Sequence, residues 1–167
     1  MTHSLKAADE GLNLRSAADD DSQDLFGLLS LCFAEYPGCF IDPHDDLKDL
    51  RKPGSSFGKN GSFWVLEDER GRVCACIALD FPEESVAEMH RLYVRPDQRG
   101  KGLGAALVRH VERHARAKGA SRIFFWSDTR FTDAHRLYAR LGYGQADGKR
   151  DLGDISNSSE YRFEKTL

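Results

Sequence analysis

The stretch DQRGKGLGAAL, Asp97 to Leu107, decides the fold, because it sets three glycines directly before an apolar, helix-forming run. Each glycine costs a helix roughly 1 kcal/mol relative to alanine, so some other role must offset that cost. Past the glycines, apolar residues recur at helical spacing, at Leu103, Leu107, Val111 and Ala115. This spacing predicts a helix that runs to about residue 118. Before them, β-branched and aromatic residues over 86–96 predict a strand that Pro96 ends.

A strand, a glycine loop and a helix in this order are suited to binding an anion. The first turn of a helix has backbone N–H groups without intrahelical partners, and these carry a partial positive charge. Glycine allows positive φ and lets a bulky anion approach the backbone. Arg99 to Gly104 therefore predicts a phosphate or pyrophosphate loop, with Arg99 and Lys101 adding charge at its rim. The alternative is a turn whose glycines only let the helix pack on its strand.

Two other phosphate motifs fit poorly. A P-loop needs Gly-Lys-Ser or Gly-Lys-Thr, and neither tripeptide occurs in the chain. A dinucleotide fingerprint needs G-x-G-x-x-G near the start of its domain. Here Gly100 and Gly102 match its first two positions, but the third falls on Ala105 and the loop lies past mid-chain.

Apolar periodicity and turn residues divide the rest of the chain into short elements. We predict strands over 12–16, 62–68, 72–80, 86–96, 121–127 and 159–165, with a turn over 81–85. Further helices are predicted over 17–36, over about 45–51, and from an N-cap at Thr132 to Gly142. This order predicts an α/β fold with a mixed sheet.

Composition predicts one soluble domain over 12–167 after a flexible tail over 1–11. The net charge of the 167 residues is -3, which gives no basic stripe for nucleic acid, and no apolar stretch approaches the ~20 residues of a membrane span. The N-terminus shows no apolar signal region, so we expect a cytoplasmic protein with reduced thiols.

Cys74 and Cys76 form a C-x-C within a predicted strand. Strand alternation would point both side chains to one face. A metal or redox pair is one interpretation, but a second C-x-C and a nearby histidine are missing. We therefore favour two small buried residues.

Two longer segments resemble the GNAT superfamily of N-acetyltransferases. RLYVRPDQRGKGLGAALVRHVERHARAKGA, residues 91–120, is similar to the family's acyl-CoA-binding core, with Val94–Arg95–Pro96 leading into Arg99 to Gly104. FFWSDTRFTDAHRLYARLGY, residues 124–143, is similar to its second block, a strand and then a helix ending in L-Y-x-x-x-G-F/Y. The resemblance is specific over about residues 86–145. It implies a mostly antiparallel sheet of six to seven strands with about four helices, splayed at an acyl-CoA slot.

The resemblance also implies acetyl-CoA as the acetyl donor. The backbone of the predicted strand 86–96 would form hydrogen bonds with the pantetheine arm at Leu92, Tyr93 and Val94. In the family a β-bulge is frequent at this point of the strand. The loop and helix start would hold its pyrophosphate through Arg99, Gly100, Lys101, Gly102, Leu103, Gly104 and Ala105.

Tyr138 matches the family position whose hydroxyl protonates the departing coenzyme A sulfur. A phenol with a pKa of ~10 suits a thiolate of similar basicity. The residue also lies on the apolar stripe of its predicted helix, so a packing role is the alternative. No metal is expected.

Glu88 is the candidate general base, because many family members keep a glutamate on this strand. Strand alternation predicts one face with Glu88, His90 and Leu92, and an opposite face with Met89, Arg91 and Tyr93. His90 is a second candidate with a suitable pKa. A surface glutamate is the alternative interpretation, and a base is dispensable if the amine arrives neutral.

The acceptor site is expected from the N-terminal helices and the loop over 32–46. Four acidic residues lie in or near this loop: Glu35, Asp42, Asp45 and Asp46. They would form an acidic lip of the site that suits a cationic amine, although a solvated acidic loop is the simpler interpretation. Phe131 stands where many family members carry an asparagine that contacts the coenzyme.

Together these features predict direct acetyl transfer to a primary amine of a small molecule or protein in a ternary complex. No cysteine falls in the motif positions, which argues against an acyl-enzyme. A non-catalytic acyl-CoA sensor is the main alternative, and a protein-interaction domain is a weaker one. The sequence does not identify the acceptor amine, and it is compatible with a homodimer.

Overall fold

A computed structural model describes residues 12–42, 44 and 48–167. Its strands are β1 Asn13–Ser16, β2 Ser62–Glu67, β3 Val73–Glu83, β4 Val86–Val94, β5 Arg122–Asp128, β6 Gly144–Asp151 and β7 Ser159–Thr166. Its helices are α1 Ser22–Phe33, α2 Lys48–Arg51, α3 Leu103–Ala117 and α4 Thr132–Arg140, with 3₁₀ turns η1 Asp19–Asp21 and η2 Pro96–Gln98. The predicted tail over 1–11 and the acidic residues Asp45 and Asp46 lie outside the described residues.

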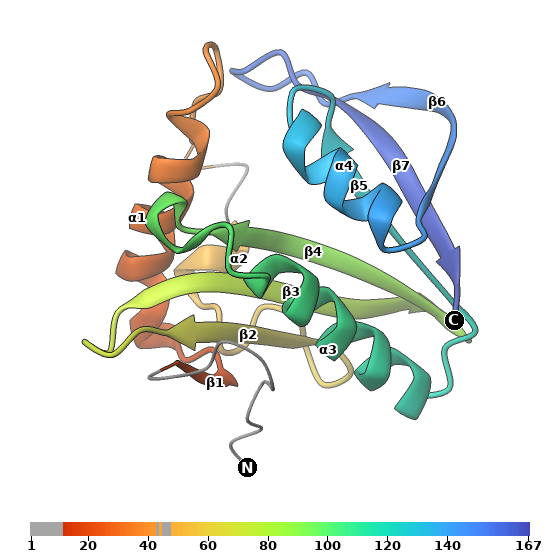
Figure 1. The fold of residues 1–167 in the computed structure, drawn as a ribbon, viewed down its shortest axis with the longest axis horizontal. Coiled ribbons are helices and arrows are strands. Elements are labelled where there is room, and N and C mark those ends of the chain that lie inside the picture. The colour runs from red at the N-terminus through yellow and green to blue at the C-terminus, as the bar shows by residue number, and fades with distance from the viewer. Residues whose placement is uncertain (1–11, 43, 45–47) are drawn as a thin grey trace.

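The strands form one sheet in the order β1-β2-β3-β4-β5-β7-β6. Neighbours pair antiparallel except β4 and β5, which are parallel and joined through α3. A parallel pair needs a long crossover, and the amphipathic run after the glycine loop supplies it. The predicted mixed, mostly antiparallel sheet with helices on both faces is confirmed (Figure 1).

The helices cover the two faces of the sheet and enclose two apolar clusters. The larger cluster joins α3 and α4 to β3, β4, β5 and β7 through residues such as Leu107, Val111, Ile123 and Phe163. The smaller cluster packs α1 and α2 against β2 and β3 through Leu25, Leu29, Leu50, Val65 and Ala78. No helix among the described residues has the length and hydropathy to cross a bilayer.

Several local predictions differ from the structure. The strand β6 was not predicted, because its sequence GQADGKRD is polar and almost wholly exposed at the sheet edge. The predicted turn over 81–85 is shorter, since β3 continues to Glu83 and pairs there with Val86. Thr132 is the first residue of α4 rather than its N-cap; Phe131 holds that position, with no side-chain cap.

Cys74 and Cys76 are both buried, but they do not share a face as alternation predicted. The pairing of β2 with β3 passes from Leu66↔Ala75 to Glu67↔Val73, which leaves one extra residue on β3. This bulge turns Cys74 into the α3-side cluster, while Cys76 lies in the α1-side cluster. A bidentate metal or redox pair is therefore excluded, and the packing interpretation is confirmed.

Candidate active site

The cleft of the molecule forms where β4 and β5 separate. The two strands pair only from Val86↔Arg122 to Glu88↔Phe124, and past Glu88 they diverge toward their C-terminal ends. A cavity of about 390 Å³ fills the gap, lined on one side by residues 88–93 and on the other by residues 125–128. Glu88 therefore lies at the closed apex of the cleft, and the chain leaves the open end of β4 toward the glycine loop.

A β-bulge at Arg91 changes which side chains face the cleft. The register with β3 passes from Ala78↔His90 to Cys76↔Tyr93, so β4 carries one extra residue, and Arg91 has φ +56°. Tyr93 consequently joins Glu88 and His90 on the α1 side of the sheet, and Leu92 packs against the α3-side cluster. The predicted face of Glu88, His90 and Leu92 is wrong, because simple alternation cannot continue through a bulge.

Two partly buried contacts hold the bulge. Arg91 Nε and Nη2 donate to the two carboxylate oxygens of Asp49 on α2, both at 2.9 Å. The Cys76 thiol donates to the Arg91 carbonyl oxygen at 3.1 Å. A non-glycine residue at positive φ costs about 1–2 kcal/mol, and these contacts stabilise it here.

The glycine loop has the backbone form expected of an anion cradle. Gly100 and Gly102 have φ of +77° and +78°, and Gly102 is the N-cap of α3. The first helical hydrogen bond runs from the Ala106 N–H to the Gly102 carbonyl, so the amides of residues 103–105 have no intrahelical partners. Within the described part of the chain, no other residue accepts a hydrogen bond from the amides of 100–102.

The three glycines have different neighbours. A Cβ at Gly100 or Gly102 would meet no protein atom within 4 Å, whereas one at Gly104 would lie 3.1 Å from Leu137 Cδ2. Close packing of α3 on the rest of the domain therefore accounts for Gly104. It does not account for the other two, whose positive φ opens the loop toward solvent.

The two basic residues of the loop already have protein partners. Arg99 donates to Glu35 Oε2 at 2.6 Å and to the Val94 carbonyl at 3.0 Å, and Lys101 donates to Gln98 Oε1 at 2.9 Å. Glu35, one of the acidic-lip candidates, thus pairs with the loop. Asp42 accepts from the His44 N–H at 2.9 Å.

Tyr138 reaches the cavity from α4. Its ring packs on Phe125, with centroids 4.3 Å apart, and the side chain lines the cavity although the residue is only 5% exposed. Burial raises the pKa of its hydroxyl well above the ordinary value. The phenol therefore stays protonated at neutral pH, as a proton donor requires.

Glu88 and His90 lie with Asp80 in one cluster at the apex. His90 Nε2 is 3.1 Å from Asp80 Oδ1 and 3.8 Å from Glu88 Oε2. Burial raises the pKa of Glu88, and the neighbouring His90 opposes that shift. The three side chains are also close enough together to hold a cation. A half-buried carboxylate with a raised pKa is suited to accept a proton near neutral pH.

The outer wall of the cavity comes from the loop after α1, which the sequence analysis assigned to the acceptor site, and from the β6–β7 region, which it did not assign. Residues 150–160 of the β6–β7 region contribute six side chains: Arg150, Leu152, Asp154, Ser156, Ser158 and Glu160. The Phe40 N–H donates to Ser156 Oγ at 2.7 Å, which joins this region to the loop after α1. No motif marks either loop in the sequence, because their positions depend on tertiary contacts.

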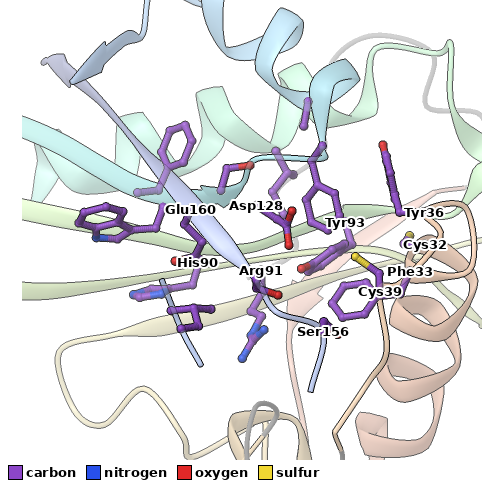
Figure 2. A pocket seen from close by; sticks show the side chains of 18 of the residues that line it. Cys32, Phe33, Tyr36, Cys39, His90, Arg91, Tyr93, Asp128, Ser156 and Glu160 are labelled. Carbon is purple, nitrogen blue, oxygen red and sulfur yellow. The ribbon is translucent and has the colours of Figure 1, made fainter. Parts of the chain in front are cut away.

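A salt bridge at the end of β5 supports that wall. Arg130 donates to Asp128 Oδ2 at 2.7 Å, to the Ser156 carbonyl at 3.2 Å and to Ser158 Oγ at 3.1 Å. Figure 2 shows Asp128 and Ser156 with Tyr36, Cys32 and Cys39 around the pocket, and with His90 and Glu160 on its other side. Phe131, which replaces the family's asparagine, packs against Tyr36 with the rings tilted by 45° and their centroids 4.8 Å apart.

The cavity brings together five of the predicted site residues: Glu88, Leu92, Tyr93, Arg99 and Tyr138. Val94 and residues 100–105 are not in its lining. They continue from its open end, where β4 leads through η2 into α3. The predicted residues therefore follow one path from the apex of the cleft to the start of α3.

Known proteins share this arrangement. A model of the acetyltransferase (GNAT) family matches residues 23–143. An uncharacterised N-acetyltransferase of Schizosaccharomyces pombe is 33% identical over 97 residues, which are 57% of this chain and 60% of that protein. The chain covers less than half the length of the next curated relatives.

Solved structures resemble nearly the whole fold. An acetyltransferase from Streptococcus agalactiae 2603 has a TM-score of 0.79 at 20% identity, covering 95% of this chain and 99% of that one. The PaiA N-acetyltransferase from Thermoplasma acidophilum, in complex with coenzyme A, has a TM-score of 0.70 at 16% identity, covering 93% and 99%. The family match includes β4, the glycine loop, α3 and the helix that carries Tyr138, and the chain belongs to the GNAT family of acetyltransferases.

Proposed function

We propose that the protein is an N-acetyltransferase that moves the acetyl group of acetyl-CoA directly to a primary amine. The observation that carries this proposal is the divergence of β4 and β5 between an open glycine loop and a cavity that contains Tyr138 and Glu88. Coenzyme A in the structure of a neighbour with the same fold supports the choice of donor. The amides of 100–105 would bind its pyrophosphate, and the β4 backbone over 92–94 its pantetheine arm.

In this mechanism the amine first loses a proton to Glu88, directly or through a water. Its nitrogen lone pair attacks the thioester carbon, forming the C–N bond and a tetrahedral intermediate whose nitrogen carries one extra proton. The nitrogen loses that proton to solvent, and collapse of the intermediate breaks the C–S bond. The sulfur leaves with the bonding electron pair and takes a proton from Tyr138, which regains one from solvent. The products are the N-acetyl amine and the free thiol of coenzyme A.

Direct transfer is favoured over an acyl-enzyme by the state of the pocket cysteines. Burial raises the pKa of both Cys32 and Cys39. The Cys32 thiol donates to the Val94 carbonyl at 3.6 Å. A protonated, engaged thiol is a poor nucleophile, so we assign neither cysteine a covalent role. The free thiols of the described cysteines agree with the reducing cytoplasm that we propose as its location.

Acetyl-CoA is expected to stabilise the folded protein against heat. A ligand at 100 times its Kd adds about 2.7 kcal/mol to the free energy of unfolding. The Gly102→Ala variant should lose most of this increment, because a Cβ at φ +78° distorts the cradle. Gly119→Ala is the matched control: it lies after the other end of α3 with φ +88° and an equally open Cβ position. Equal retention of the increment in both variants would argue against the loop as the binding site.

Turnover separates the enzyme from a sensor. Free thiol released from acetyl-CoA in the presence of an amine panel should rise with time for at least one amine. Thermal stabilisation by acetyl-CoA without thiol release from any amine would favour the sensor instead.

Chelation is expected to leave the activity unchanged. Asp80, Glu88 and His90 could hold a cation, but a bound cation would compete with the amine proton for Glu88. Acetyl transfer measured before and after dialysis against EDTA should therefore agree. A loss of activity that Zn²⁺ or Mn²⁺ restores would replace the base mechanism with a metal-assisted one.

A further inference from the structure

Every arginine that lines the cavity is already neutralised by a carboxylate. Arg91 pairs with Asp49 at 2.9 Å and Arg99 with Glu35 at 2.6 Å. Arg150 pairs with Glu160 at 2.6 Å and also lies over the Trp126 ring, 4.2 Å from its centroid. A carboxylate or phosphate on the acceptor would therefore meet no arginine whose charge is uncommitted.

The carboxylates of the lining are not all neutralised in the same way. Asp128 pairs with Arg130 at 2.7 Å and Asp133 with Arg136 at 2.5 Å. Glu88 and Asp154 have no lysine or arginine within ion-pair distance in the described chain. In the described chain His90 is the cationic side chain within 4 Å of the Glu88 carboxylate, and the guanidinium groups of Arg150 and Arg162 act on it from farther away. Asp154 accepts from the Ser158 N–H at 2.7 Å. The charge left for a ligand inside this cavity is negative.

The outer wall carries apolar side chains among its polar ones. Phe40 and Leu152 line the cavity and are 59% and 45% exposed, so their apolar surface is open to a ligand. They come from the loop after α1 and from the region after β6, which the Phe40–Ser156 hydrogen bond joins. Ile155, 56% exposed, belongs to the same region. Trp126 also lines the cavity, with the Arg150 guanidinium over one part of its ring.

We infer that the acceptor is a primary amine on an apolar body without an acidic group, bound with its ammonium toward Glu88. This inference rests on the proposed acetyl transfer and names the substrate class of the same site. In an amine of this class the ammonium group would lie next to the Glu88 carboxylate, and the apolar body would pack against Phe40, Leu152 and Trp126. An α-amino acid would bring a carboxylate into the cavity without a partner, and this desolvation is unfavourable.

Matched amines that differ only in the carboxylate test the inference. We expect kcat/KM, measured by thiol release, to be about tenfold or more higher for tyramine than for tyrosine, and for phenethylamine than for phenylalanine. Spermidine, which is cationic but has no apolar body, should be a poorer substrate than tyramine. Equal or better use of tyrosine, or a preference for spermidine, would overturn the inference.

A charge placed in the wall gives a second test on the same site. Leu152→Arg puts an uncommitted guanidinium on an exposed position of the lining, and should lower the tyramine-to-tyrosine ratio of kcat/KM by about tenfold. Leu152→Gln, which is polar but neutral, should change that ratio much less. Identical ratios in both variants would contradict the electrostatic argument.

The result for acetyl-CoA alone keeps the two proposals apart. If acetyl-CoA stabilises the protein and amines outside the named class are acetylated, the proposed acetyl transfer is supported and the proposed acceptor class is wrong. If acetyl-CoA neither stabilises the protein nor releases thiol with any amine, the proposed function itself is wrong.

Discussion

Replacing Tyr138 by phenylalanine is expected to lower kcat for acetyl transfer by about 10²- to 10⁴-fold, the range of general acid catalysis. The KM for acetyl-CoA should change little, because the ring keeps its packing on Phe125 and only the hydroxyl is lost. Without that proton the sulfur must leave as a thiolate in a cavity that disfavours charge. Steady-state kinetics with saturating amine measure both constants.

Tyr143→Phe is the control for this variant. Its hydroxyl donates to the buried Glu112 at 2.9 Å, and its side chain is not in the lining of the cavity. Loss of that hydrogen bond should reduce thermal stability and leave kcat near its original value. If Tyr138→Phe retains full kcat with unchanged affinity, the residue only packs, and another group or solvent protonates the sulfur.

The second large effect is expected from Glu88→Gln. The amide keeps the size of the side chain but cannot accept the amine proton, so kcat/KM should fall by about 10²-fold or more at neutral pH. Burial raises the pKa of Glu88, and the carboxyl must be ionised to act. Activity of the unmodified enzyme should therefore rise with pH through a pKa above the ~4.3 of an ordinary glutamate.

The pH profile distinguishes a base from a merely structural glutamate. In Glu88→Gln the rise assigned to Glu88 should vanish, and the remaining rate should follow the fraction of neutral amine. Glu83→Gln, on the exposed end of β3, should keep the original profile. A Glu88→Gln enzyme with full activity and an unchanged profile would mean that the amine arrives neutral and needs no base.

The sequence was sufficient to predict the central part of the fold because its signals there are local. Glycines at positive φ, a proline after β4 and an apolar stripe on α3 each act within a few residues. Strand β6 had no such signal, since an exposed edge strand needs no apolar side chains. Its pairing with β7 depends on backbone hydrogen bonds that any sequence can make.

The site could be predicted only in part, for the same reason. Glu88 and Tyr138 lie in regular elements whose place follows from the pattern. The bulge at Arg91 depends on a salt bridge to Asp49, which lies 42 residues earlier. Because of this bulge, Leu92 and Tyr93 lie on the opposite faces of the sheet from those that strand alternation predicts. The Phe40–Ser156 contact joins residues 116 apart. Neither contact leaves a periodicity that a single sequence can reveal.

The contact between Gly104 and Leu137 has a consequence for how variants of this protein are interpreted. Leu137 precedes Tyr138, so the start of α3 and the turn that carries the phenol are in direct mechanical contact. A methyl group added at Gly104 would require the Leu137 side chain to give by a few tenths of an ångström, and a displacement passed on to the α4 backbone would shift the phenol of the next residue. Weaker diphosphate binding and slower protonation would then arise together, and one substitution at this position would resemble damage at two separate sites.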